Sequence, residues 1–243
     1  GAMIGYVDDA DVCSAGLGLY ERTENEHARQ DIINALVRAD CDMRRRLGGE
    51  VAGRLAGRLE AMSARDRWQA LVLIGEVGDP EDAELQARLE ALDAPMAAAG
   101  VPFADGRGRK QIGVPEDCEL RTALLFARAN LGSAKALEEF ADVALHGPAA
   151  RRHNALKFMR RCCPAPRLLR LVRALLDDGA VVYRRPLSGT NYAEEETAAE
   201  YAVDAMVEWY PELPVRRHSL ALYQEDDIAT CRAWVDARLA GVE

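Results

Sequence analysis

The chain has 243 residues, a formal net charge of −9 and a hydrophobic content of 49%, which suffices for one large domain or an elongated array of repeats. No apolar run in the sequence reaches the roughly 18 residues that a membrane span needs, and the acidic balance disfavours nucleic acid as a general partner. These properties predict a cytoplasmic protein that does not enter a membrane. Residues 1–3 resemble the remnant of a cleaved expression tag.

Helical periodicity begins near residue 24. A capping-box pattern that starts at Thr23 precedes apolar residues at helical spacing, and together they predict a helix over 24–39. A second apolar series predicts its partner helix over 51–59. The small residues Gly53 and Gly57 interrupt that series and are expected to permit close packing between helices.

The most specific local signals lie between residues 63 and 92. Ser63 is predicted to cap a helix that ends at Gly78. The following Asp79 is predicted to cap a second helix, and Pro80 to occupy its first position. The sequence therefore predicts two short helices joined by a tight turn.

Glycine and proline residues divide the chain into two regions. Residues 94–115 are rich in both, which predicts a long loop between an N-terminal region, 4–93, and a C-terminal region, 116–243. A second irregular stretch, 179–193, is predicted as an inserted loop in which residues 181–183 can form a short extended piece. Helices are predicted in the C-terminal region at 116–131, 134–146, 149–162, 166–178, 194–209 and 225–240.

The helix-pair pattern recurs three times. Each copy has an Ala-Leu pair, beginning at Ala70, Ala123 or Ala155, and the leucine that opens the next apolar face follows 15, 14 or 13 residues later. Helix pairs of this kind cannot bury their apolar faces singly, so they stack on their neighbours. The predicted fold is all-α, a short irregular α-solenoid of about five antiparallel helix pairs.

Residues 67–92, which contain the segment GDPEDAELQARLEAL after an Arg and an Ala-Leu pair, resemble the HEAT-repeat family, especially its bacterial lyase-like branch. Residues 121–145 and 152–177 resemble it more loosely. The resemblance implies a right-handed stack of helix pairs whose second helices line a concave surface. HEAT proteins chiefly bind proteins, some bind nucleic acid, and a minority act on DNA bases or bilin chromophores. A shared fold alone does not carry an activity.

No catalytic or metal-binding pattern is recognisable in the sequence. The four histidines do not share one helical face as zinc ligands do, and no serine lies in a nucleophile elbow. We therefore predict no enzymatic activity, no cofactor and no metal. The six cysteines form no CxxC pair and mostly occupy apolar helical positions, which predicts buried, reduced thiols.

Arginine is concentrated between residues 145 and 190. This segment contains ten basic residues and only two acidic ones, so its local charge is +8. The remainder of the chain from residue 191 has a charge of −8. Guanidinium groups suit carboxylate or phosphate partners, and three-residue spacing keeps side chains near one helical face. Six residues, called the basic belt below, are predicted to bind a partner: Arg160, Arg167, Arg170, Arg173, Arg184 and Arg185.

Two interpretations of the basic belt remain open. It is either an anion-facing groove, with Arg184 and Arg185 on an adjoining loop, or an internal clamp onto acidic helices such as 194–208. That helix carries an acidic stripe, which is predicted to face solvent: Glu200, Asp204 and Glu208.

The predicted function is a non-catalytic protein-binding scaffold that uses a concave helical surface and the basic belt. An inhibitor or immunity-type protein is one version. The alternative is a nucleic-acid-binding or DNA base-processing module, in which Trp209 with Asp204, or Trp234 with Asp236, would surround an extruded base. The acids around both tryptophans would repel a phosphate backbone.

Overall fold

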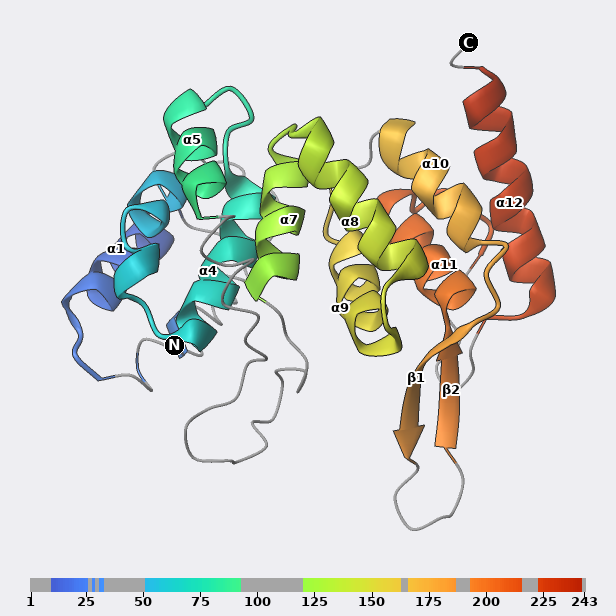
Figure 1. Cartoon of the computed structure of the whole chain (residues 1–243), viewed down its shortest axis with the longest axis horizontal. Coiled ribbons are helices and arrows are strands. Elements are labelled where there is room, and N and C mark those ends of the chain that lie inside the picture. Colours follow the sequence, from blue (N-terminus) through green and yellow to red (C-terminus); the bar gives the residue numbers. More distant parts are fainter. Residues whose placement is uncertain are drawn as a thin grey trace. The chain divides into compact units, whose positions relative to one another are not determined.

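Helices dominate the computed structural model (Figure 1), as the sequence predicts. The only strands among the described residues form one two-stranded sheet, and no helix there is long and apolar enough to cross a membrane. The chain divides into two compact units, Gly1–Glu138 and Glu139–Glu243. The structure describes residues 10–25, 28, 31, 32, 51–92, 120–162, 166–186, 193–215 and 223–241. The predicted loop at 94–115 lies outside them.

Unit 1 begins with a helix that the sequence analysis missed, α1 (Ala10–Arg22). Its glycines lower helix propensity and interrupt the apolar pattern, yet Tyr20 is buried at 2% exposure. Arg54, in the helical segment 51–56, joins that segment to α1, because its Nε–H donates to the Glu21 carboxylate at 2.9 Å. That segment, residues 51–56, runs into a 3-10 turn, η2 (Leu59–Ala61). Most of the helix predicted at 24–39 lies outside the described residues.

The two short helices predicted between residues 63 and 92 are present as α4 (Ala64–Val77) and α5 (Ala83–Ala91). Ser63 caps α4 as predicted. The predicted cap of α5 was wrong, because Asp82 caps this helix and accepts the backbone N–H three residues later at 2.9 Å. Asp79 instead accepts the N–H two residues later, the pattern of an Asx turn rather than of a helix cap.

Close helix packing in unit 1 occurs between α4 and α7 (Leu120–Asn130). A Cβ atom added at Gly75 would lie 2.8 Å from the Cα of Ala127 and 2.8 Å from a ring carbon of Phe126. No described residue lies within 4 Å of a Cβ added at Gly53, and most of the helix predicted to pack there, 24–39, lies outside the described residues. The contact between α4 and α7 requires glycine at position 75, because only a residue without a side chain lets the two backbones approach so closely.

The helix that follows, α8 (Ala134–His146), has the predicted bounds. Ser133 begins it by accepting the backbone N–H of Ala136 at 3.3 Å. The boundary between the two compact units falls inside α8.

Unit 2 is built around α11, which contacts α9, α10 and α12. The side of α11 that faces these helices is lined with small and apolar residues of near-zero exposure. Cys162 and Cys231 are buried free thiols, as predicted; the side chains of the other four cysteines lie outside the described set. The elements of this unit are α9 (Ala149–Met159), α10 (Pro166–Leu175), β1 (Val181–Pro186), β2 (Ala193–Thr197), α11 (Ala198–Trp209) and α12 (Glu225–Ala240).

The segment predicted as an inserted loop, 179–193, instead contributes to a β-hairpin. Strands β1 and β2 pair antiparallel, with Arg184 opposite Glu195 and an irregular register near Val181. Opposite charges directly across a ladder stabilise strand pairing. Strand β1 also packs on α9, which gives the hairpin a helical backing.

The start of α11 also differs from the prediction, because the residues before Ala198 belong to β2. Thr197 and Glu200 form a reciprocal capping box that fixes the helix start. Glu200 is only 9% exposed, so the prediction that it faces solvent was wrong. Asp204 is half-buried and accepts the Tyr223 hydroxyl at 2.8 Å.

Candidate functional site

Helix α10 presents arginine on one side and leucine on the other. Arg167 and Arg170 are exposed. The apolar residues between and after them are buried against the unit: Leu168, Leu169, Leu171, Val172 and Leu175. This segregation is typical of a helix packed on a core by one face. Two members of the basic belt therefore lie one helical turn apart in solvent.

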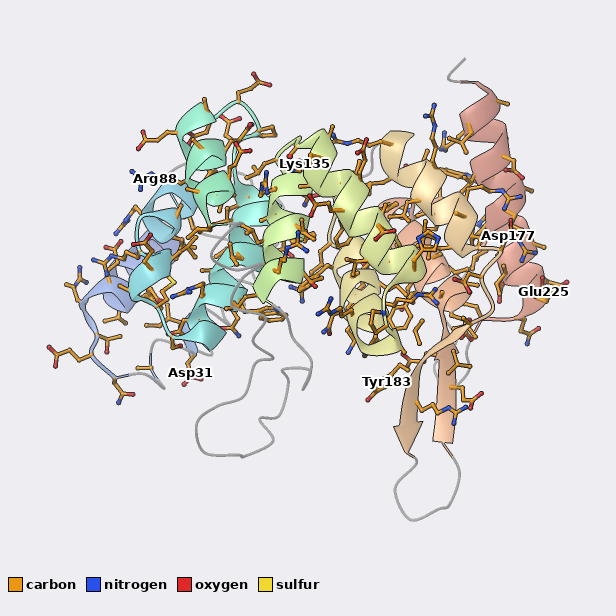
Figure 2. All side chains as sticks on the ribbon, in the orientation of Figure 1. Asp31, Arg88, Lys135, Asp177, Tyr183 and Glu225 are labelled. Atoms are coloured by element: carbon orange, nitrogen blue, oxygen red, sulfur yellow. The ribbon has the colours of Figure 1, made fainter. Side chains whose placement is uncertain are left out.

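Arg173, the third arginine of α10, is occupied by contacts within the unit. Its Nε–H donates to the Asp236 carboxylate of α12 at 2.6 Å, and its Nη1–H donates to Asp177. Arg232 of α12 lies 2.8 Å from the same Asp177 carboxylate, which is labelled in Figure 2. The Arg173 guanidinium lowers the pKa of Asp177, and Asp236 raises the pKa of Arg173. Arg173 thus clamps α10 to α12, whereas the sequence analysis considered a clamp onto 194–208.

We expect Arg173→Ala to lower the free energy of unfolding of the chain by about 1 kcal/mol, because it removes a partly exposed ion pair that joins two helices. The matched variant Arg170→Ala should change stability by less than about 0.5 kcal/mol, since it alters a solvent-facing position. Urea unfolding followed by circular dichroism measures both. Equal effects of the two variants would contradict the clamp.

The remaining belt residues lie at the end of α9 and on β1. Arg160 follows the last turn of α9, and its carbonyl accepts the Trp209 indole N–H at 3.2 Å. Arg184 is exposed on β1, where its Nε lies 3.0 Å from the Glu195 carboxylate. Arg185 is also on β1, not on a loop, and its side chain lies outside the described residues. Of the basic belt, therefore, only Arg167 and Arg170 lie together on one exposed helical face.

A buried polar chain, which the sequence analysis did not find, joins α9, the hairpin and α11. His153 is 6% exposed, and its Nε2 lies 2.8 Å from the Tyr201 hydroxyl. That hydroxyl donates to the Glu196 carboxylate of β2. The His153 ring also stacks on Tyr183 of β1, with centroids 4.3 Å apart; Tyr183 is labelled in Figure 2.

The electrostatics of this polar chain keep His153 and Tyr201 neutral. Burial, together with the nearby Lys157 ammonium, lowers the pKa of His153 to about 4. Burial and the Glu196 carboxylate raise the pKa of Tyr201. Because the Tyr201 hydroxyl donates to Glu196, its oxygen accepts from His153, which places the imidazole proton on Nε2. The polar chain fixes the hairpin on the helices. A neutral His153 and a protonated Tyr201 suit that structural role.

No signal in the sequence predicts this polar chain. His153 and Tyr201 are 48 residues apart, and Glu196 lies in a segment that resembles a helix start. Among the described residues, no group of three or more His, Cys, Asp or Glu side chains is placed to hold a metal ion.

Aromatic side chains gather where the end of α11 meets α12. The rings of Tyr210 and Trp234 are 4.3 Å apart and tilted by 48°, and Trp209 meets the edge of Tyr210. The Arg238 guanidinium lies 3.6 Å from the centroid of Trp234. Its Nη2 lies 3.3 Å from the Glu212 carboxylate.

The carboxylates considered for a base-processing site both have partners in the protein. Asp204 accepts the Tyr223 hydroxyl, and Asp236 accepts Arg173. Neither arrangement adds support to the enzymatic alternative.

Comparison with known proteins finds no relative: no family model matches the chain, and no match appears among curated proteins or solved structures. The resemblance to HEAT repeats therefore remains a prediction from the sequence.

Proposed function

We propose that the chain is a non-catalytic protein-binding scaffold, a short α-solenoid that captures a partner through an acidic surface patch of that partner. Arg167 and Arg170 on α10 make the primary contact. The observation that supports this proposal is the segregation on α10, which exposes both arginine residues while it buries its leucines. A cytoplasmic inhibitor or immunity-type protein is one form of this function.

The arginine pair is carried on a fixed support. Arg173 joins α10 to α12 through Asp236, and Val172 and Leu175 are fully buried. A helix held in this way presents its exposed side chains with little loss of backbone freedom on binding. Guanidinium groups one turn apart suit carboxylates that are spaced on a partner helix or loop.

A nucleic-acid partner is the second candidate. The acid-poor segment between residues 145 and 176 favours it, since guanidinium groups also bind phosphate. The net charge of −9 for the whole chain opposes it, because long-range repulsion weakens binding to a polyanion.

The test compares a charge reversal on α10 with a matched reversal elsewhere. We expect Arg167→Glu/Arg170→Glu to weaken binding of the natural partner about 30-fold, which corresponds to about 2 kcal/mol for two partly exposed charge contacts. Arg58→Glu/Lys135→Glu makes the same change in net charge at exposed positions of unit 1 and should leave binding nearly unchanged. The partner is captured from source lysate with the wild-type chain, identified, purified and titrated calorimetrically.

Circular dichroism and the Tm should be similar for all three proteins, because exposed charged side chains contribute little to folding. If both double variants weakened partner binding equally, the effect would come from net charge alone, and this would contradict the placement of the binding surface on α10. Capture of duplex DNA, with affinity that falls steeply as salt rises, would support the nucleic-acid candidate instead.

A further inference from the structure

A second surface of unit 2 has the composition of a ligand site. It consists of the half-buried rings of Tyr210 and Trp234, the Glu212 carboxylate, and the Arg238 guanidinium that lies over the rings. The arginine surface on α10 shares none of these residues. Aromatic rings and arginine are the side chains most enriched where proteins bind partners tightly.

The two rings come from different elements, and the Tyr210 ring has a support that does not involve Arg238. Tyr210 terminates α11, and Trp234 lies in the middle of α12. Trp209 packs against Tyr210 in a T-shaped arrangement and is itself fixed by the hydrogen bond from its indole N–H to the Arg160 carbonyl. The ring pair is therefore a preorganised surface.

The group that covers the rings shows which chemistry they accept. The Arg238 guanidinium lies 3.6 Å from the Trp234 centroid and 5.3 Å from the Tyr210 centroid, a distance range in which a cation is attracted to the electron-rich ring faces. One of its nitrogens also lies 3.3 Å from Glu212. A planar cation is thus recognised by ring faces on one side and by a carboxylate at its edge.

We propose that Tyr210, Trp234 and Glu212 form a binding site for a guanidinium group, namely an arginine side chain of a partner protein, and that Arg238 occupies this site until the partner displaces it. The side chain of Arg238 is 45% exposed and lies in the last turns of α12. A cation at such an exposed ring face is held weakly, so exchange for an arginine from outside requires no rearrangement of the helices.

The proposal is tested by removing the internal occupant. In Arg238→Ala, a blocked Gly-Arg-Gly peptide should cause a saturable shift of the Trp234 indole N–H resonance, with at least tenfold tighter binding than in the wild-type chain. The matched Gly-citrulline-Gly peptide, which is neutral but nearly the same shape, should not bind. Ethylguanidinium is the second probe: equal binding assigns recognition to the guanidinium alone, and weaker binding assigns part of it to the peptide backbone.

Two further variants in the Arg238→Ala background identify the site. Trp234→Leu should abolish the binding, and Glu212→Gln, at an exposed position, should weaken it several-fold without affecting the fold. The proposal is overturned if Arg238→Ala shows no saturable shift, if the citrulline peptide binds equally well, or if Glu212→Gln leaves the affinity unchanged.

Discussion

Acidification from pH 7 to pH 4 should lower the free energy of unfolding by about 3 kcal/mol through His153 alone. Burial lowers the pKa of this imidazole in the folded chain from 6.5 to about 4. Between these two values the unfolded chain binds a proton that the folded chain does not bind. The contribution of His153 to stability is therefore complete above about pH 6.5, decreases as the pH falls to 4, and is constant below that.

The groups that face His153 account for its resistance to protonation. Tyr201 of α11 accepts the Nε2–H, and Tyr183 of β1 covers the ring face. Lys157, one turn further along α9, adds a positive charge that disfavours imidazolium. The only nearby carboxylate in the polar chain, Glu196, is bonded to Tyr201 rather than to the imidazole.

Urea unfolding at several pH values between 7 and 4 measures this contribution, with His153→Gln as the control. Glutamine can still donate to Tyr201 but does not titrate, so the variant should lose most of the dependence on pH in this range. Glu200 changes the free energy of unfolding in the opposite direction as the pH falls, because burial raises its pKa. This contribution is the same in both proteins. Parallel pH profiles for the two proteins would contradict the assignment to His153.

Alanine should have opposite effects at two helical glycines of unit 1. At Gly75 the new methyl group would lie 2.8 Å from the Cα of Ala127 in α7, and relief of that overlap must separate α4 from α7. We expect Gly75→Ala to cost about 2–3 kcal/mol, the upper part of the range for overpacked cores. At Gly53 no atom of the described residues lies within 4 Å, so alanine should stabilise the helix by about 0.5–1 kcal/mol.

Thermal and urea unfolding of the two variants measure these changes. The comparison is internally controlled, because both substitutions add the same methyl group and the same gain in helix propensity. Stabilisation by both variants would show that α4 and α7 do not pack as described.

The two helices that could be predicted closely both begin at a polar residue that caps the N-terminus, Ser133 or Gln224. The predicted ranges 134–146 and 225–240 agree with α8 and α12. α1 was missed because its glycines weaken the local signal, although tertiary packing of residues such as Tyr20 overrides that weakness.

The hairpin and the buried polar chain could not be predicted because they depend on pairing between distant segments. Three consecutive acids, Glu194 to Glu196, favour a helix N-terminus by their charge. Only the arginines of β1 across the ladder make the same residues suitable for a strand. The partners of His153 likewise come from the hairpin and α11. For the basic belt, spacing placed Arg167 and Arg170 on one face, but it could not indicate that Asp236 occupies Arg173.

The hairpin has a further consequence for how the chain behaves at high concentration. Neither β1 nor β2 has another strand beside it among the described residues, so each has an outer row of backbone groups to which a strand of a second molecule can be added. Arg184 and Glu195 are exposed on these strands, at 69% and 48% of their side-chain surface. A second β1 strand beside β1 would bring arginines together, and a second β2 strand beside β2 would bring glutamates together, so pairing between identical edges is disfavoured. The charges that hold the two strands in register thereby also disfavour contact between identical edges of separate molecules.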